Sequence, residues 1–393
     1  MGSEMSGRVG ARRAGHEGRR VLILSASMGS GHDGVAAELA ARLAAEGADS
    51  EIIDVLQMFP LRLGSALRRG YRWMILHAPW LYEVIYQVFF VGKRAGGTSP
   101  LTALAVPRLR RLLAARAPDE VVSTFHLAAQ LTGLLRERGG LPCPSTVLVT
   151  DFAVHRLWLH RGNDLYLCPN PDVIGEIAAR TGRPALHCAP VVRPEFTRVA
   201  TGRQGAIGPP GVIGPGRAVG PGDVGFGERF VLVSSGSWGV GDVVATARAL
   251  AGSGRYTPLV LCGNNAGLRR RLQAEGLGPG LGWRDDVPEL MAAAYALVDN
   301  GSGLTCEEAF AAGLPVIVHR PIPGHGRAGA RGMARAGVSV HTGTAPALLA
   351  ALDLLEDPLS RKRQADRARA LFSSMPAQAG LISAARRSRF GPG

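Results

Sequence analysis

The sequence predicts an α/β protein of two domains, each built on a parallel sheet. Short aliphatic runs, typical of strands buried on both faces, alternate with alanine-rich stretches of helical length over most of the 393 residues. Two of these runs, residues 21–24 and 230–233, lead into glycine-rich loops that precede a predicted helix. Between them, residues 200–228 are rich in glycine and proline, which predicts a linker or insertion and not a folded layer.

These features give the expected domain boundaries. We expect a disordered basic N-terminus at 1–19, an N-terminal domain at 20–199, the linker at 200–228, a C-terminal domain at 229–355 and a helical tail at 356–393. A loose basic tail is the alternative for the last segment.

Composition limits the expected partners. The formal net charge of +14 favours anionic partners such as acidic lipids or phosphate groups. Only Lys93 and Lys362 of the 45 basic residues are lysine, so the arginine content is explained by codon usage and does not itself indicate a nucleic-acid ligand. We therefore expect no nucleic acid among the partners.

The cysteines and the N-terminus indicate a reducing, cytoplasmic location. Five cysteines are scattered without CxxC spacing, so neither a disulfide framework nor a metal site is expected. The first twenty residues are polar and basic and lack the apolar core of a signal peptide. No apolar run approaches the ~18 residues of a transmembrane helix.

The first glycine-rich loop, residues 25–34, matches the dinucleotide-binding pattern GxGxxG through Gly29, Gly31 and Gly34, with Asp54 placed as the ribose-binding acid. In that pattern the first glycine follows its strand almost directly, whereas here four residues intervene. The longer loop is better explained as the rim of a pocket.

Three polar residues lie where an open α/β sheet binds its ligands. His32 comes just before the predicted helix at 35–46 and could act as a general base. Asp151 and His155 follow a predicted strand at 145–149, at the end where such sheets carry their sites. A loop histidine facing solvent and a capping aspartate are the alternatives.

Residues 59–93 interleave aromatic side chains with arginines on short predicted helices, as in elements that lie in a membrane interface. We expect Arg68, Arg69, Trp73 and Trp80 to contact an anionic membrane surface, where each basic residue contributes about 1 kcal/mol. Helix–helix core packing with solvated arginines is the alternative.

The most informative stretch of the C-terminal domain is residues 301–324. A predicted strand ends in a glycine loop, and a helix carrying Glu307 and Glu308 follows and stops at Gly313. The loop leaves N–H groups free at a helix N-terminus, where an anion binds well, and Glu308 could accept both hydroxyls of a ribose. This predicts a nucleotide diphosphate site. An ordinary strand–helix–strand connection with solvated glutamates is the alternative.

The chain resembles the monogalactosyldiacylglycerol synthase family of glycosyltransferases, related to the N-acetylglucosaminyltransferase that makes lipid II. The resemblance spans roughly residues 21–355. The motifs that carry it, in chain order, are Gly29-Ser30-Gly31-His32, Thr150-Asp151 with His155 and Trp158, Pro190-Val191-Val192-Arg193-Pro194-Glu195-Phe196, the loop 236–241, Cys262-Gly263-Asn264, Gly282-Trp283-Arg284-Asp285-Asp286-Val287, Ser302-Gly303-Leu304-Thr305 with Glu308, and Pro321-Ile322-Pro323-Gly324.

The resemblance implies a GT-B fold, in which two Rossmann-like domains face a central cleft. It implies inverting, metal-independent transfer of a hexose from a UDP-sugar to a diacylglycerol-like lipid hydroxyl, without a cofactor, by an enzyme peripheral on the inner face of the plasma membrane. It implies that His32 is the base, with Asp151 and His155 as supports or competitors, and that Gly29 and Gly31 lie on the acceptor side. The implied UDP-sugar ligands are Gly236, Ser237, Asn264, Arg284, Val287, Ser302, Gly303, Thr305, Glu308 and His325.

The chain departs from this family at His325, Gly326 and Gly329, where members usually carry glutamine, glutamate and asparagine. The sugar donor is therefore left open, and so are three other functions. A non-catalytic GT-B protein could bind a nucleotide sugar or lipid, and a UDP-sugar epimerase could share the fold. The GxGxxG pattern with Asp54 leaves a nicotinamide-dependent oxidoreductase.

Overall fold

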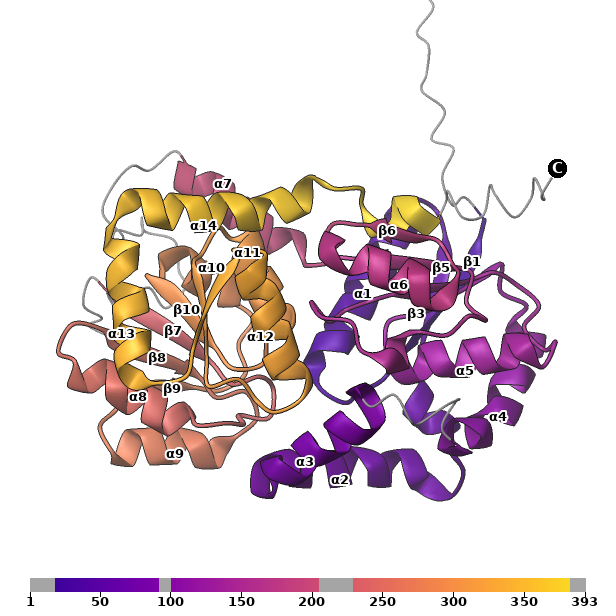
Figure 1. The fold of residues 1–393 in the computed structure, drawn as a ribbon, viewed down its shortest axis with the longest axis horizontal. Helices are drawn as coiled ribbons and strands as arrows, with labels where there is room; N and C mark the ends of the chain where they lie inside the picture. The colour runs from indigo at the N-terminus through magenta and orange to yellow at the C-terminus, as the bar shows by residue number, and fades with distance from the viewer. Residues whose placement is uncertain (1–17, 92–99, 205–228, 382–393) are drawn as a thin grey trace, which may run out of the picture.

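The protein forms two α/β domains side by side, each with a six-stranded parallel sheet between helices (Figure 1). The computed structural model describes residues 18–91, 100–204 and 229–381. The predicted fold class is thereby confirmed. Most of the expected N-terminal segment (1–17), most of the expected linker (205–228) and the end of the tail (382–393) lie outside the described residues.

The N-terminal sheet has the order β2-β1-β3-β4-β5-β6, and all its neighbouring strands are parallel. The central strands are buried along their length, which explains their continuous aliphatic runs. Its strands are β1 (Arg20–Ser25), β2 (Asp49–Asp54), β3 (Glu120–Ser123), β4 (Ser145–Leu148), β5 (Leu165–Cys168) and β6 (Ala185–His187); its covering helices are α1 (Ser30–Ala45), α4 (Pro100–Arg116), α5 (His126–Glu137) and α6 (Ile174–Thr181).

The C-terminal sheet has the order β12-β11-β10-β7-β8-β9, again with parallel neighbours. The order reverses between β10 and β7, the kind of switch point where an open α/β sheet binds ligands. Its strands are β7 (Phe230–Ser234), β8 (Thr257–Leu261), β9 (Gly280–Leu281), β10 (Ala296–Asp299), β11 (Val316–His319) and β12 (Ser339–Thr342); its helices are α8 (Val243–Gly252), α9 (Ala266–Ala274), α10 (Val287–Ala293), α11 (Leu304–Ala311), α12 (His325–Arg335) and α13 (Ala345–Asp353).

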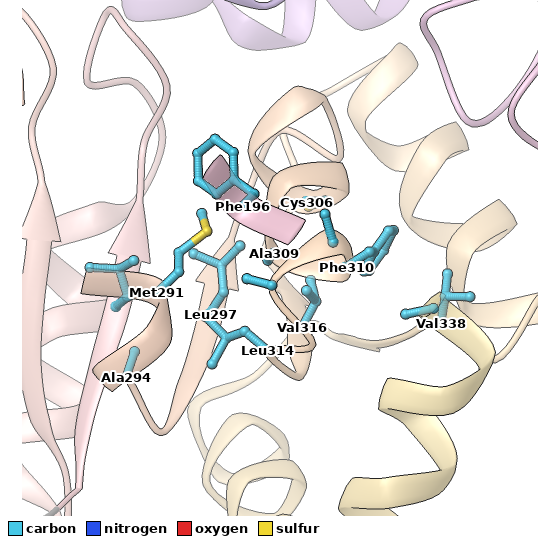
Figure 2. Packing of buried hydrophobic residues seen from close by; sticks show 14 of the residues in the cluster. Phe196, Met291, Ala294, Leu297, Cys306, Ala309, Phe310, Leu314, Val316 and Val338 are labelled. Atoms are coloured by element: carbon cyan, nitrogen blue, oxygen red, sulfur yellow. The ribbon is translucent and has the colours of Figure 1, made fainter. Parts of the chain in front are cut away.

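Helix α11 sits at the centre of the C-terminal core. Its Cys306, Ala309 and Phe310 pack among side chains of α10 and of the neighbouring strands (Figure 2). Because this face of α11 is taken up by the core, residues at the intervening positions must face elsewhere, toward the N-terminal domain. The packing of α11 thus determines where Glu307 and Glu308 can point.

The chain crosses between the domains twice. Helix α7 (Pro194–Gln204) buries Phe196 in the C-terminal core (Figure 2). Helix α14 (Pro358–Ala370) lies along the C-terminal domain, and beyond it Ala377 and Leu381 are buried in the core of the N-terminal domain (Figure 1). At each crossing, the chain that leaves one domain contributes buried side chains to the core of the other.

Two element boundaries differ from the prediction. Helix α1 begins at Ser30 and not at residue 35, because Gly31 and Gly34 let its first turns lie against Leu304 of α11; a Cβ at Gly34 would come within 2.8 Å of the Leu304 side chain. Helix α7 continues five residues into the expected linker. Apolar contacts between domains, which no local pattern reveals, account for the first difference.

Residues 63–91 form a helical hairpin, which we call the α2–α3 hairpin, placed at the mouth between the two domains (Figure 1). It comprises α2 (Leu63–His77), α3 (Pro79–Ile85) and a π-helical segment (Tyr86–Val91). Its inner side packs Ile75, Tyr82 and Tyr86 against Val240 of the C-terminal domain. Within the described ranges, no helix combines the length and the apolar character that crossing a bilayer requires.

Candidate active site

A cavity of about 1380 Å³ lies between the domains, at the carboxyl ends of both sets of strands. Ordinary small-molecule sites occupy about 300–1,000 Å³, so this cavity has room for more than one ligand. Glycine loops of both domains line it, as does the inner side of the α2–α3 hairpin. The two loops also meet directly, since the backbone N–H of Ser30 donates to Ser237 Oγ over 3.4 Å.

On the C-terminal side, Asp299 organises the glycine loop. Its Oδ2 accepts hydrogen bonds from the N–H groups of Gly301 and Ser302, both at 2.7 Å. Ser302 has a φ of +54°, and its hydroxyl donates to the Gly326 carbonyl over 3.0 Å, away from the cavity. Any contact of Ser302 with a diphosphate would therefore come from its backbone, and this contact stays a prediction. Its hydroxyl instead joins the loop to α12.

Beyond this turn, Gly303 and Thr305 line the cavity at the N-terminus of α11. The first N–H groups of a helix have no carbonyl partner within the helix, and its dipole is positive at this end. The arrangement can bind a diphosphate. This is the backbone arrangement from which the diphosphate site was predicted, and the ligand itself stays a prediction.

The two glutamates of α11 have different surroundings. Glu308 lines the cavity, and burial raises its pKa to about 7, although Arg193, which also lines the cavity, acts against this. Glu307 is 3% exposed and lies across a small interdomain cavity from Thr150 and Val191. Burial, together with the charges of Asp151 and Glu308, raises the pKa of Glu307 to about 8. The alternative of solvated glutamates is therefore wrong.

Four other predicted ligands, Gly236, Ser237, Arg284 and Val287, line the cavity. The guanidinium of Arg284 is paired with Asp286 of its own loop, which fixes its position. The fifth, Asn264, does not line the cavity: its side chain is exposed, and its backbone N–H donates to the Ser237 carbonyl over 2.9 Å. A left-handed glycine, Gly263 (φ +54°), turns the chain here and directs the Asn264 side chain to solvent.

On the N-terminal side, His32 projects into the cavity from the first turn of α1 and not from a preceding loop. Its Nδ1 lies 2.8 Å from Thr150 Oγ1, and its ring meets Phe125 edge-on at 4.8 Å. Nε2 is therefore the ring nitrogen left for a ligand. Burial lowers the pKa of His32, so the ring is neutral at pH 7 and can accept a proton.

Asp151 is the charged centre of the N-terminal side. Its Oδ2 accepts a hydrogen bond from Trp158 Nε1 at 2.8 Å and lies 3.6 Å from His155 Nε2. Burial alone would raise the pKa of Asp151, but the hydrogen bond and electrostatic interaction with His155, together with the electrostatic interactions with His325 and His32, outweigh it and lower the pKa. Asp151 is therefore ionised at neutral pH and can stabilise a protonated imidazole nearby.

His155 and Asp151 together form a second possible base. His155 is buried, and its Nδ1 has no hydrogen-bond partner among the described residues. A carboxylate beside one ring nitrogen favours the tautomer in which the other can accept a proton. The structure thus brings together all three residues predicted as catalytic.

The prediction missed several lining residues. His126 begins α5 after strand β3, and its ring lies 5.1 Å from that of His155. Its position after a strand was a usable signal, the same one that singled out Asp151. Tyr71 and Tyr82 of the α2–α3 hairpin also line the cavity, and no local pattern separated them from the aromatic residues on the outer side.

The four predicted membrane residues lie outside the cavity on exposed parts of the hairpin. Trp73 is 57% and Trp80 is 68% exposed, and Arg68 and Arg69 are exposed one helical turn earlier in α2. Other exposed apolar residues of this region are Leu61, Leu76, Val84, Val88 and Val91, and Phe89 is exposed but also lines the cavity. The hairpin therefore has an apolar and basic outer side and an inner side that faces the cavity.

The residues of the dinucleotide pattern have structural roles. The Asp54 carboxylate accepts the Leu56 N–H at 2.8 Å and caps a short 3₁₀ turn. Gly31 and Gly34 allow the approach to Leu304. The oxidoreductase alternative therefore loses the features that motivated it. Among the described residues, no group of three or more His, Cys, Asp or Glu side chains is arranged to hold a metal ion.

Comparison with known proteins agrees with this architecture. The model of the monogalactosyldiacylglycerol (MGDG) synthase family matches residues 32–184. A processive diacylglycerol beta-glucosyltransferase of Bacillus cereus is 24% identical over 333 residues, which cover 82% of this chain and 81% of that protein. The chain thus aligns with this relative through both domains.

Two solved structures share the fold at lower identity. MurG of Acinetobacter baumannii superimposes with a TM-score of 0.53 at 15% identity, covering 94% of this chain and 99% of that one. A putative UDP-N-acetylglucosamine 2-epimerase of Listeria monocytogenes gives 0.55 at 15% identity, covering 95% and 97%. The GT-B arrangement of two Rossmann-like domains is confirmed, and so is the resemblance to the monogalactosyldiacylglycerol synthase family that the sequence motifs predicted.

Proposed function

We propose that the protein is a glycosyltransferase that moves a hexose from a UDP-sugar to the hydroxyl of a diacylglycerol-like lipid at a membrane surface. The observation that carries the proposal is one cavity lined by the N-terminus of α11 with Glu308 on one side and by His32, Asp151 and His155 on the other. The named activity of the Bacillus cereus relative, which aligns over both domains, supports the lipid acceptor.

The donor binds to the C-terminal side. The N–H groups at the start of α11 hold the diphosphate and stabilise the charge that develops when UDP leaves. Glu308 accepts hydrogen bonds from the ribose hydroxyls, and the backbone between Arg284 and Val287 faces the uracil ring. In this mechanism the helix N-terminus takes the role that a metal ion has in other transferases, and no cofactor is required.

The transfer step needs one base. His32 Nε2 takes the proton of the acceptor hydroxyl while the hydroxyl oxygen forms a bond to the anomeric carbon of the sugar. The bond from that carbon to the diphosphate oxygen breaks, and UDP leaves with the electron pair. Attack opposite the leaving group inverts the anomeric configuration. The ionised Asp151 stabilises the imidazolium, and the Asp151–His155 pair is the competing base.

The acceptor reaches the cavity past the α2–α3 hairpin. The outer side of the hairpin, with Trp73, Trp80, Arg68 and Arg69, rests on an anionic membrane, each basic residue contributing about 1 kcal/mol. We propose that this membrane is the inner face of the plasma membrane. The lipid headgroup hydroxyl then needs to rise only into the adjoining cavity.

The test is transfer from UDP-galactose, UDP-glucose, UDP-N-acetylglucosamine or UDP-glucuronic acid into diacylglycerol held in anionic liposomes. We expect a glycolipid product from one donor. UDP binding without product from any donor would contradict the transferase function and favour a non-catalytic binding protein. Conversion of the UDP-sugar without any lipid would indicate an epimerase.

A further inference from the structure

Helix α3 of the N-terminal domain holds the segment of the C-terminal domain that leads into α12. Glu83 Oε2 accepts the backbone N–H of Gly324 at 2.9 Å and a guanidinium N–H of Arg327 at 3.1 Å. One residue earlier in α3, the Tyr82 hydroxyl lies 2.9 Å from His325 Nδ1. Two successive residues of one domain thus hold three neighbouring residues of the other.

The contact depends on Gly324. Its φ of +72° is in the left-handed region, which disfavours residues with a side chain. A Cβ at this position would come within 2.8 Å of the Tyr82 ring and 2.9 Å of the Tyr86 ring. The backbone of the second domain therefore lies directly on the rings of Tyr82 and Tyr86, in a conformation that only glycine adopts without strain.

The contact also orients a cavity residue. With Nδ1 engaged by Tyr82, the His325 ring is fixed edge-on to the tyrosine, with ring centroids 5.9 Å apart, and Nε2 is the nitrogen left for a ligand. Tyr82 is itself buried and packs against Tyr71, with ring centroids 5.2 Å apart. The orientation of His325 is thus determined by buried residues of the opposite domain.

We propose that Tyr82 and Glu83 are positioning residues for the sugar-nucleotide donor. Tyr82 orients His325 toward the donor, and Glu83 holds the Gly324 turn and α12 close to the glycine loop that Ser302 joins to Gly326. Donor affinity then depends on a helix that belongs to the acceptor-side domain. The identity of the ligand rests on the proposed function, and the test therefore measures binding, which does not require transfer.

The variants separate positioning from ordinary packing. Tyr82→Phe keeps the ring against Gly324 and removes the hydroxyl, and Glu83→Gln keeps the size and removes the charge. Tyr86→Phe is the matched control, because its ring also contacts Gly324, it does not line the cavity, and no hydrogen bond of its hydroxyl to the described residues is seen. His325→Ala serves in combination with Tyr82→Phe.

The experiment is calorimetric titration of each variant with UDP-glucose and UDP-galactose, together with the melting temperature of the free protein. We expect Tyr82→Phe and Glu83→Gln each to weaken binding of the preferred UDP-sugar about 3- to 10-fold, and Tyr86→Phe to leave it within about 2-fold. In the His325→Ala background, Tyr82→Phe should add little, because its effect passes through His325.

Unchanged affinity in both variants would overturn the proposal. So would an equal loss in Tyr86→Phe, or full additivity of Tyr82→Phe with His325→Ala, since either would indicate packing alone. Normal UDP-sugar binding without transfer into lipid would count against the proposed function and leave this inference standing.

Discussion

The Asp151 carboxylate lies 3.6 Å from His155 Nε2, while Nδ1 of the same ring is buried without a partner among the described residues. His32, the predicted base, is instead hydrogen-bonded through Nδ1 to Thr150. Of these two candidate bases, only His155 is adjacent to the carboxylate. Substitution of each in turn separates their roles.

His32→Ala should lower turnover about 100-fold or more and leave UDP affinity within about 2-fold, because general-base catalysis contributes about 10²–10⁴-fold. Steady-state transfer and UDP calorimetry would measure the two quantities. His155→Ala is the companion variant. If it abolishes transfer while His32→Ala remains active, the Asp151–His155 pair is the base.

The enzyme should stay active at pH values below those at which an ordinary histidine becomes protonated. Burial lowers the pKa of His32 below the ordinary histidine value of 6.5, so the ring stays neutral as the pH falls through that value. The acid limb of the kcat/KM profile, which reports the free enzyme, should accordingly have its midpoint below 6.5. A midpoint above 6.5 would contradict His32 as the base in its present surroundings.

Glu308→Ala should weaken UDP binding about 10- to 100-fold, since hydrogen bonds to a charged group contribute about 1.5–3 kcal/mol. Because burial raises the pKa of Glu308 to about 7, wild-type affinity should also fall as the pH drops through that value and the carboxylate is protonated. Glu308→Gln should lack this part of the pH dependence. Calorimetry at pH 6 and 8 checks both points. If the UDP affinity of the wild type and of Glu308→Gln changed with pH in the same way, Glu308 would not be the ribose ligand.

Glu307→Gln should stabilise the protein at alkaline pH and have little effect near pH 5. The pKa of Glu307 rises from 4.5 to about 8 on folding, so the folded state binds the proton more tightly and wild-type stability falls as the pH rises through this window. One pKa unit corresponds to about 1.4 kcal/mol, so the difference amounts to a few kcal/mol at most. Melting temperatures at pH 5.5 and 8.5 would reveal it, and a constant difference between the two proteins would contradict the buried carboxylate.

Replacing Trp73 and Trp80 together by alanine should reduce sedimentation with anionic vesicles at least several-fold and leave UDP affinity unchanged. Both indoles are more than half exposed and neither lines the cavity. Leu354→Ala is the control, because Leu354 is 65% exposed on the C-terminal domain. Equal vesicle binding by the double variant and the control would locate the membrane surface elsewhere.

The fold was predictable because its determinants are local. The buried strands are continuous aliphatic runs, and left-handed glycines such as Gly313 end helices where expected. The backbone placement of the site followed from the same rules, since Asp151 and Thr305 sit at strand and helix ends that face the cavity.

Side-chain direction was less predictable, because contacts distant in the sequence decide it. Ser302 turns to Gly326, and Asn264 is directed to solvent by the turn at Gly263. Gly31 and Gly34 of the first loop lie against Leu304, which is 270 residues after Gly34 in the chain. A single sequence does not show which distant residues come into contact. The GxGxxG pattern could therefore be rejected as a dinucleotide site, but the reason for its glycines could not be predicted.

The α2–α3 hairpin connects the cavity to the outer surface, because the same pair of helices contributes to both. Its inner side holds His325 and Gly324, while Trp73 and Trp80 are exposed on the same pair of helices. In thermodynamic terms such an element is a shared degree of freedom, and linkage makes its effects reciprocal. If the proposed membrane attachment restrains the hairpin, the bilayer becomes an effector of nucleotide binding, and the nucleotide strengthens attachment to the bilayer by the same factor. The binding constants for donor and bilayer would then not be independent quantities, and each would have meaning only at a stated concentration of the other.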